Sequence, residues 1–108
     1  MRKRDEIISL LREPGIIAVV RASKKEQVLP LAEALLEGGV IAIEITMTTP
    51  NAIDAIREAA ARLGSRALLG VGTVLNAETC RNAVAAGAEF VVSPITKAEI
   101  LEAAHAAD

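Results

Sequence analysis

The sequence predicts an α/β fold of consecutive parallel βαβ units, and two observations support this prediction. Apolar runs with strand character begin near Ile16, Val40, Ala67 and Glu89, and a stretch with helical periodicity follows each of them. Hydrophobic residues make up 52% of the 108 residues, whereas Phe90 is the one aromatic residue, so the core has to be aliphatic. Strands that alternate with helices at this spacing form parallel sheets through helical crossovers.

A short amphipathic helix is expected before the first strand. Ile7, Ile8, Leu10 and Leu11 recur at helical spacing within the first twelve residues. The pair Pro14-Gly15 interrupts this pattern and predicts the end of the helix.

Each of the four later helices has a start signal in the sequence. The signals are two capping boxes, a threonine before a proline at the first helical position, and a capping asparagine. In chain order they are Ser23 with Glu26, Thr49 before Pro50, Asn76, and Thr96 with Glu99.

Glycines mark the ends of the first three of these helices. They are Gly38-Gly39, Gly64 and Gly87, at positions where a left-handed residue commonly ends a helix. Pro30 is a local conflict, because a proline inside a helix bends it or costs about 3 kcal/mol.

No linker or shift in composition divides residues 1–108, which predicts a single domain. Four βα units are compatible with two architectures. One is a small open doubly wound sheet, and the other is half of an eight-unit barrel. The pattern of elements alone leaves both open.

The charge of the chain argues against a nucleic-acid partner. The net charge is −2, the sequence pI is near 5.4, and Trp and Tyr are absent. Nucleic-acid-binding domains are usually basic and carry stacking aromatic residues. We interpret the basic residues Arg2, Lys3 and Arg4 as a solvated helix end.

One cysteine excludes an internal disulfide, and no segment resembles a signal peptide or a membrane span of about 20 apolar residues. A reduced, cytoplasmic setting without a membrane partner is therefore expected. Cys80 has no nearby histidine in its helical run and is interpreted as a small packing residue. His105 has no second ligand at metal spacing, so we expect a surface histidine and no metal site.

Glu44 is the first candidate functional residue. It lies in the apolar run that starts at Val40, where a carboxylate is costly unless the strand end opens into a site. Alternation along the strand places Glu44 on one face with Ala42 and Thr46, while the three isoleucines of the run face the helices. Desolvation there would raise the pKa of Glu44 and suit it to general acid/base chemistry.

Arg21 is the natural counterpart of Glu44, because it follows the run IIAVV at the end of the first strand. In both architectures, ligands gather at the carboxyl ends of the strands. If the two strands are neighbours, Arg21 pairs with Glu44 or binds a substrate anion. A buried Arg21–Glu44 pair without a catalytic role is the alternative.

Two further strand ends are candidates for ligand contact. The stretch GVGTVLN, from Gly70 to Asn76, permits close backbone approach and presents Thr73 near a helix start. It lacks the third glycine and the later acidic residue of a dinucleotide-binding motif, so a packing role for the glycines is the alternative. Ser93 and Pro94 are interpreted first as a strand exit and second as a ligand contact.

Four motifs, in this order and spacing, resemble those of one enzyme family. AVVRA, EITMTTP, GVGTV and AGAEFVVSP are similar to the motifs of 2-keto-3-deoxy-6-phosphogluconate (KDPG) aldolases and of their phosphogalactonate and 4-hydroxy-2-oxoglutarate aldolase relatives. The resemblance runs from about Gly15 to the end of the chain. It implies the first half, (βα)4, of a (β/α)8 TIM barrel, preceded by the short N-terminal helix.

The resemblance implies a class I aldolase without a metal or other cofactor. In this family a lysine forms a Schiff base with the keto carbon of the substrate, which is then cleaved to pyruvate and glyceraldehyde 3-phosphate. The expected partners are therefore a phosphorylated 2-keto-3-deoxy sugar acid and pyruvate.

The resemblance also implies roles for individual residues. Glu44 matches the general acid/base, Thr73 the threonine of a GxGT motif that lines the active site, and Pro94 a proline that borders the pyruvate-binding region. Thr48 stands where many relatives have a substrate-binding arginine in an E-x-T-x-R-T motif, and Arg21 is the residue offered in its place. Thr48 and Arg21 are therefore expected to bind substrate, and the identity of the sugar acid stays open.

The Schiff-base lysine of the family lies on the sixth strand and its phosphate-binding loops on the last two, beyond Asp108. The lysines of this chain, Lys3, Lys24, Lys25 and Lys97, match none of the catalytic positions and are expected to be solvated. The resemblance therefore implies a homo-oligomeric enzyme in the complete protein and an inactive 108-residue chain.

Two other hypotheses remain. One is a non-catalytic half-barrel that serves as a binding or assembly module, because a half-barrel leaves two sheet edges and an apolar inner face unpaired. Two copies would close an eight-stranded barrel. The other is a flavodoxin-like domain, which lacks support because the chain has neither an acidic phosphoacceptor cluster nor a full phosphate loop.

Overall fold

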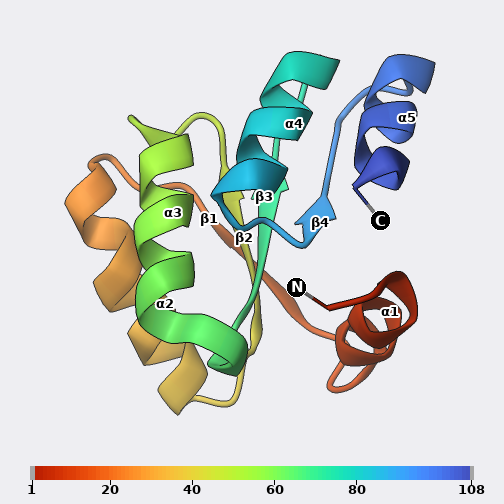
Figure 1. The fold of residues 1–108 in the computed structure, drawn as a ribbon. Coiled ribbons are helices and arrows are strands. Elements are labelled where there is room, and N and C mark those ends of the chain that lie inside the picture. Colours follow the sequence, from red (N-terminus) through yellow and green to blue (C-terminus); the bar gives the residue numbers. More distant parts are fainter. Residues whose placement is uncertain (1, 108) are drawn as a thin grey trace.

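The computed structural model describes residues 2–107, so both ends of the expected 1–108 domain, Met1 and Asp108, lie outside the described residues. Helices and strands alternate along the chain (Figure 1). In chain order they are α1 (Arg4–Arg12), β1 (Ile17–Val20), α2 (Val28–Glu37), β2 (Ala42–Thr46), α3 (Ala52–Leu63), β3 (Leu68–Gly72), α4 (Ala77–Ala86), β4 (Phe90–Val91) and α5 (Ala98–Ala106), with 3-10 turns at Lys25–Gln27 and Gly64–Arg66.

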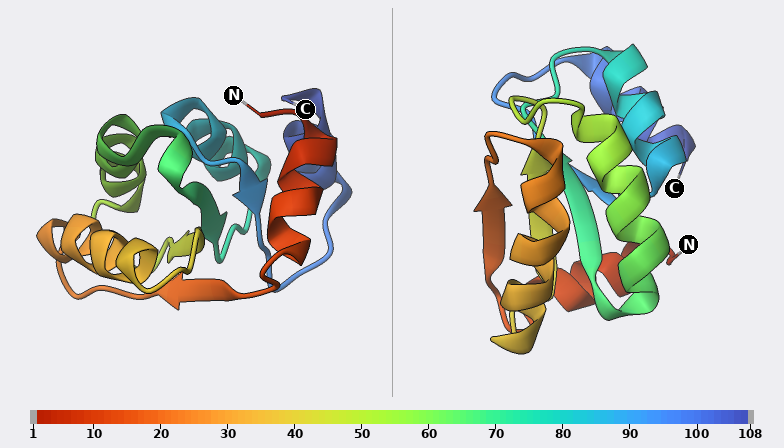
Figure 2. Two further views of the ribbon diagram at one scale, coloured as in Figure 1. Left: turned by 90° about the horizontal axis from the view of Figure 1, so that it is seen from below. Right: turned by 90° about the vertical axis from the view of Figure 1, so that its left-hand side faces the viewer.

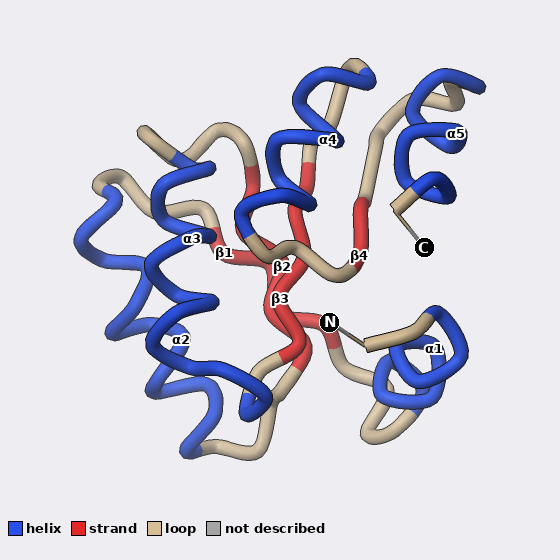
Figure 3. The backbone as a smooth tube through the Cα atoms, viewed as in Figure 1, coloured by secondary structure: helices blue, strands red, loops and turns tan. Residues whose placement is uncertain are grey.

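Within residues 2–107, four parallel strands form one sheet in the order β1-β2-β3-β4. Each strand pairs with the next one along the chain. Val19 lies opposite Glu44, Glu44 opposite Gly70, and Gly70 opposite Phe90. The strands run side by side through the centre, with helices around them (Figure 3). This is the predicted arrangement of four βα units behind an N-terminal helix.

The two faces of the sheet are covered differently. Helices α2, α3 and α4 follow one side of the strands, whereas α1 lies on the other side, near β4 (Figure 2). We call the first side the helix-covered face and the second the open face.

The helix-covered face carries the main core. Ile43 and Ile45 of β2 are fully buried there, as the alternation along the strand predicts. They belong to one cluster with Val71 of β3 and Ile56 of α3. Helix α5 joins this cluster through Ile100, so the core continues past the last strand.

Helix α1 covers only part of the open face. Ile7 is buried in a small cluster with Ala42 and Leu68, and Leu10, Leu11 and Phe90 pack around them. Farther along, apolar side chains remain exposed. The exposed fraction is 41% for Ile17, 49% for Val19 and 39% for Val92.

Several predicted helix boundaries are confirmed. Asn76 caps α4, because its Oδ1 accepts a hydrogen bond from the backbone N of Thr79 at 2.8 Å. Helices α2, α3 and α4 end at the predicted glycines. Gly39, Gly64 and Gly87 have positive φ angles, a conformation that suits glycine.

The capping box predicted for Ser23 and Glu26 is wrong. Ser23 donates from both its backbone N and its Oγ to Oε1 of Gln27, at 3.1 and 3.0 Å. A 3-10 turn that begins at Lys25 precedes α2. This turn brings Gln27 rather than Glu26 within hydrogen-bond distance of Ser23.

The capping box predicted for Thr96 and Glu99 is also wrong. Helix α5 begins at Ala98, so Lys97 rather than Thr96 takes the N-cap position. The Oε1 of Glu99 instead lies 3.7 Å from the Nζ of Lys97.

The two prolines near helix starts differ from expectation. Pro50 lies in a turn and not at the first helical position, because α3 begins at Ala52 after Asn51 in the left-handed region. Pro30 falls in the first turn of α2, where a backbone N–H has no partner within the helix. The bend and the energetic cost predicted for Pro30 therefore do not arise.

Candidate active site

Glu44 is the middle residue of β2 and lies on the open face. Only 7% of it is exposed, and it stands in register with Val19 on one side and Gly70 on the other. Its side chain leans toward the end of the strand and occupies the space beside Gly72. A Cβ atom on Gly72 would lie 2.6 Å from Cδ of Glu44 and closer still to Oε2. The backbone of β3 therefore forms one wall of the carboxylate site.

The environment of the Glu44 carboxylate favours its neutral form. Burial raises the pKa of Glu44 above its ordinary value, and the positive charge of Arg21 partly opposes that rise. Among residues 2–107, no group donates a hydrogen bond to the carboxylate or pairs with it. No side-chain polar atom in this part of the chain is fully buried without a partner, so the carboxylate oxygens keep some access to the open side.

Arg21 follows β1 at the same end of the sheet and is exposed. The charge of Arg21 lowers the pKa of Glu44, but the two side chains, both described by the structure, form no ion pair. The alternative interpretation, a buried Arg21–Glu44 pair, is therefore wrong. The next residue, Ala22, donates its backbone N–H to Oγ1 of Thr49 at 3.2 Å. This hydrogen bond ties the exit of β1 to the loop after β2.

Thr48 is exposed in the loop after β2, and its Oγ1 lies 2.6 Å from Oγ1 of Thr46. Thr46 is fully buried and shares its face with Glu44, since the two are separated by one residue on the strand. The hydroxyl groups of Thr46 and Thr48 thus form a polar row that leads from Glu44 to the loop after β2.

Thr73 and Pro94 also lie at this end of the sheet. Thr73 directly follows β3 and has a φ of 60°, an unusual conformation for a β-branched residue that stores backbone strain. Pro94 is exposed in the loop after β4, next to Ser93, whose Oγ donates to the carbonyl oxygen of Val74 at 2.6 Å. Four of the five predicted site residues therefore follow the C-terminal ends of strands, and the Glu44 side chain extends toward that end from the middle of β2.

The sequence did not predict the contacts between strands at the C-terminal end of the sheet. Thr49, which is 2% exposed, was interpreted as a helix start and instead accepts the hydrogen bond from Ala22. Gly72 was recognised only as a place of close approach, without its partner Glu44. Because each contact joins residues on different strands, local patterns carried no signal that named the partner.

The remaining reactive side chains lie apart from this arrangement. Cys80 is fully buried, and burial raises the pKa of its thiol, as befits a packing residue. His105 is exposed, as predicted. No cluster of three His, Cys, Asp or Glu side chains between residues 2 and 107 is arranged to hold a metal ion.

Three of the four lysines are exposed, as expected. Lys3, Lys24 and Lys97 are exposed, and Lys25 is half-buried. Lys97 donates from its Nζ to the carbonyl oxygen of Leu75 at 3.2 Å.

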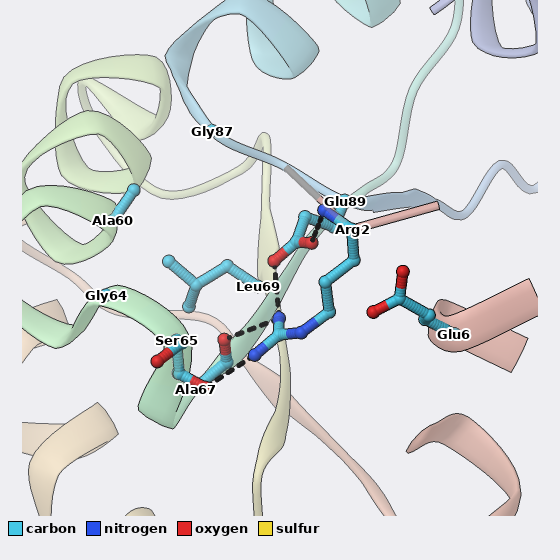
Figure 4. A pocket seen from close by; sticks show the side chains of 9 residues that line it. All are labelled: Arg2, Glu6, Ala60, Gly64, Ser65, Ala67, Leu69, Gly87 and Glu89. Atoms are coloured by element: carbon cyan, nitrogen blue, oxygen red, sulfur yellow. Dashed lines mark hydrogen bonds and ion pairs between the residues drawn. The ribbon is translucent and has the colours of Figure 1, made fainter. Parts of the chain in front are cut away.

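A pocket of about 450 Å³ lies at the opposite end of the sheet, where β3 and β4 begin. Arg2 spans it and forms a 2.7 Å ion pair with Glu89, and it also donates to the carbonyl oxygens of Ser65 and Ala67 (Figure 4). Arg2 therefore links the N-terminal segment to Glu89 and to the segment before β3. Its interpretation as a solvated residue is wrong. Its hydrogen-bonding groups are occupied by the protein itself, so this pocket is a weaker candidate for a functional site than the end with Glu44.

In the part of the chain that the structure describes, no helix is both long and apolar enough to cross a membrane.

Comparisons with known proteins agree with this arrangement. The model of the family described as "Aldolase: KDPG and KHG aldolase" matches residues 7–108. The KHG/KDPG aldolase of Escherichia coli (strain K12) is 40% identical over 96 residues, which are 89% of this chain and 45% of the relative. The 2-dehydro-3-deoxy-phosphogluconate aldolase of Treponema pallidum is 44% identical over 91 residues, which are 82% of this chain and 41% of the relative.

Solved structures show the same likeness in three dimensions. The 2-keto-3-deoxy-6-phosphogluconate aldolase of Zymomonas mobilis ZM4, solved with 3-phosphoglycerate, has a TM-score of 0.83 and 36% identity, and the match covers 96% of this chain and 49% of that one. The KDPG aldolase of Legionella pneumophila, with pyruvate captured as a covalent carbinolamine intermediate, has a TM-score of 0.74 and 40% identity over 81% of this chain and 42% of that one.

This chain spans about half the length of the curated relatives it matches. Its four parallel strands, alternating helices and N-terminal helix match part of the TIM barrel of these enzymes. On the family model, the sequence identity and the shared fold together, the chain belongs to the KDPG and KHG aldolase family.

Proposed function

We propose that residues 1–108 form one domain, the amino-terminal half-barrel of a class I aldolase of the KDPG type. In the complete protein it takes part in cleaving 2-keto-3-deoxy-6-phosphogluconate, or the phosphogalactonate analogue, to pyruvate and glyceraldehyde 3-phosphate. The observation that carries this proposal is the state of Glu44. It is a nearly buried carboxylate with a raised pKa and no partner among residues 2–107, at the end of the sheet where barrel enzymes bind substrates.

Glu44 acts as the general acid/base in this proposal. A carboxyl group with a raised pKa is a better proton donor and acceptor for a substrate hydroxyl or a water molecule than an ordinary glutamate is. The absence of a hydrogen-bond donor within the described residues leaves its oxygens available to the substrate.

Substrate binding falls to the residues around Glu44. Arg21 is exposed and unpaired in the described part of the chain, so its guanidinium is available to a carboxylate or phosphate group of the substrate. Thr48 and Thr73 add a hydroxyl group each at the same end of the sheet, and Pro94 borders it. Thr48 in place of the arginine found in many relatives leaves Arg21 as the cation of this set.

The Schiff-base lysine belongs to the other half of the barrel in this proposal. A carbinolamine, as captured in the Legionella pneumophila relative, requires an amine. The lysines of this chain are exposed or half-buried, and Lys97 donates to the carbonyl oxygen of Leu75. The complete enzyme is a cytoplasmic homo-oligomer in this proposal.

A second candidate is a non-catalytic half-barrel module for binding or assembly. The exposed apolar side chains of the open face, Ile17, Val19 and Val92, favour a partner that covers them. Both candidates share this partner surface. They differ in whether Glu44 performs chemistry once the surface is covered.

The test is to join residues 1–108 to the remaining carboxyl-terminal part of the Escherichia coli relative and to compare this fusion with the 108-residue chain. Each is incubated with pyruvate and borohydride, which fixes a Schiff base, and the intact mass is measured. We expect an adduct on the fusion and none on the 108-residue chain. An adduct on the 108-residue chain would show that one of its own lysines is the nucleophile and would overturn the proposed division of labour.

Glu44→Gln and Arg21→Ala in the fusion separate the two candidates. Glu44→Gln keeps the shape of the side chain and removes the proton exchange, so KDPG cleavage should fall by about 10²-fold or more while the fold is retained. Arg21→Ala should chiefly raise the Michaelis constant. Full activity of the Glu44→Gln fusion would refute the acid/base role, and an unchanged Michaelis constant would leave Arg21 without a binding role.

A further inference from the structure

Two glycines of β3 face the open side of the sheet, and each accommodates a side chain from a different neighbouring strand. A Cβ on Gly70 would collide with the ring of Phe90 from β4, whose Cδ2 would lie 2.5 Å away. A Cβ on Gly72 would collide with Glu44 from β2. One strand thus provides room for an apolar side chain on one side and for the candidate catalytic carboxylate on the other.

The collision at Gly72 involves the whole end of the Glu44 side chain. The hypothetical Cβ lies 2.6 Å from Cδ and 3.0 Å from Cγ, in addition to its overlap with Oε2. Rotating the carboxylate about its last bond would move Oε2 but would leave Cδ and Cγ where they are. A side chain at position 72 therefore forces Glu44 into a different rotamer.

The rest of the site does not fix this rotamer. Among residues 2–107, no hydrogen bond or ion pair holds the Glu44 carboxylate. On its other side, Glu44 faces Val19, which is half-exposed at the edge of the sheet. A displaced carboxylate therefore has an open path toward solvent across β1.

We propose that Gly72 is a positioning residue for Glu44, because the absence of a side chain at position 72 forms the seat in which the carboxylate lies at the end of the sheet. Its value for catalysis rests on the proposed acid/base role of Glu44, whereas the seat itself can be tested without any activity. The same geometry explains why the chain requires glycine here although Gly72 is not among the residues with a positive φ.

The first test is a carboxyl titration of Glu44 by NMR in the 108-residue chain with ¹³C-labelled glutamate. In the unsubstituted chain, burial raises the pKa of Glu44. In Gly72→Ala we expect that pKa to fall toward the ordinary glutamate value, because the displaced carboxylate regains water. Gly70→Ala is the matched control, since the atoms nearest to its new methyl group belong to Phe90, and it should leave the titration unchanged. An unchanged pKa in Gly72→Ala, or an equal fall in both variants, would overturn the proposal.

The second test covers the case in which Gly72→Ala is too unstable to titrate. Glu44→Ala removes the atoms with which the new methyl group collides. The loss of urea midpoint caused by Gly72→Ala should therefore be at least halved in the Glu44→Ala background, whereas the loss caused by Gly70→Ala should stay the same. Equal losses for Gly72→Ala in both backgrounds would refute the seat. Because neither test measures turnover, an inactive fusion would count against the proposed function and leave this inference standing.

Discussion

The two faces of the same sheet differ in how completely the chain covers them. On the helix-covered face, Ile43 and Ile45 are fully buried against α3 and its neighbours. On the open face, α1 buries a small cluster around Ile7, and Val19 remains 49% exposed beyond it. Helices of this chain thus bury the apolar side chains of the helix-covered face, whereas on the open face they bury only those near α1.

The main hydrophobic core and the candidate site therefore lie on opposite faces of the sheet. Most of the buried aliphatic side chains that stabilise the fold lie on the helix-covered face, and none of the five candidate site residues belongs to that cluster. Glu44, Thr46 and the space beside Gly72 lie on the open face, where Ile17 and Val19 remain exposed. The residues that a barrel partner would cover are therefore neighbours of the residues proposed to do chemistry.

The largest expected effect tests the helix-covered face. Ile56→Ala removes a fully buried side chain from the middle of α3 and should lower the free energy of unfolding by about 3 kcal/mol. Ile17→Ala on the open face, where the side chain is 41% exposed, should lower it by less than about 1 kcal/mol. Urea unfolding followed by circular dichroism measures both, since the chain has no Trp or Tyr for fluorescence. Equal losses would contradict the division into a complete and an incomplete face.

A smaller effect is expected for the charge on the open face. Because burial raises the pKa of Glu44 in the folded state, its contribution to stability is present at low pH and is lost as the pH rises through that pKa. Glu44→Gln does not ionise, so it should be more stable than the unsubstituted chain by about 1 kcal/mol at pH 7. This gain should vanish below about pH 4.

Urea midpoints between pH 3 and 8 measure this difference, where the pH range brackets the ordinary carboxyl pKa of about 4.3. Glu58→Gln is the control for the chemical change itself, because Glu58 is exposed on α3, away from the open face. A Glu44→Gln chain that is less stable at pH 7 would mean that the carboxylate is held by a favourable partner in solution.

The smallest effect expected in the 108-residue chain concerns Val19, at the edge of the sheet. Val19→Lys should change the free energy of unfolding of the 108-residue chain by less than about 0.5 kcal/mol, because a half-exposed position allows the charged end to reach water. In the fusion with the carboxyl-terminal part of the Escherichia coli relative, the same lysine should be buried in the closed barrel and destabilise it by several kcal/mol. An equally small effect in the fusion would show that the open face stays open there.

The elements of the fold follow from the sequence because each is specified locally. Alternating apolar residues define β2, and Asn76 and the glycines after α2, α3 and α4 bound the helices as predicted. The helix starts at Ser23 and Thr96 were misjudged, since neighbouring residues, Gln27 and Lys97, compete for the same role and only the local geometry decides between them.

The candidate site was predictable in part for the same reason. Glu44 stood out because a carboxylate in an apolar strand is conspicuous in any sequence. The contacts that surround it were not predictable, since the seat at Gly72 and the hydrogen bond from Ala22 to Thr49 join segments that lie far apart in the chain. Arg2 was missed in the same way, because its partner Glu89 lies at the other end of the sequence.

The order of the strands in the sheet has a consequence for how the protein is made. Since β1 pairs with β2, β2 with β3, and β3 with β4, each strand after β1 pairs with the strand synthesised just before it. The sheet can therefore grow one βα unit at a time as the chain leaves the ribosome, without waiting for a distant segment. Each added unit brings a helix for the helix-covered face, whereas Ile17, Val19 and Val92 of the open face stay exposed to water when the sheet is finished.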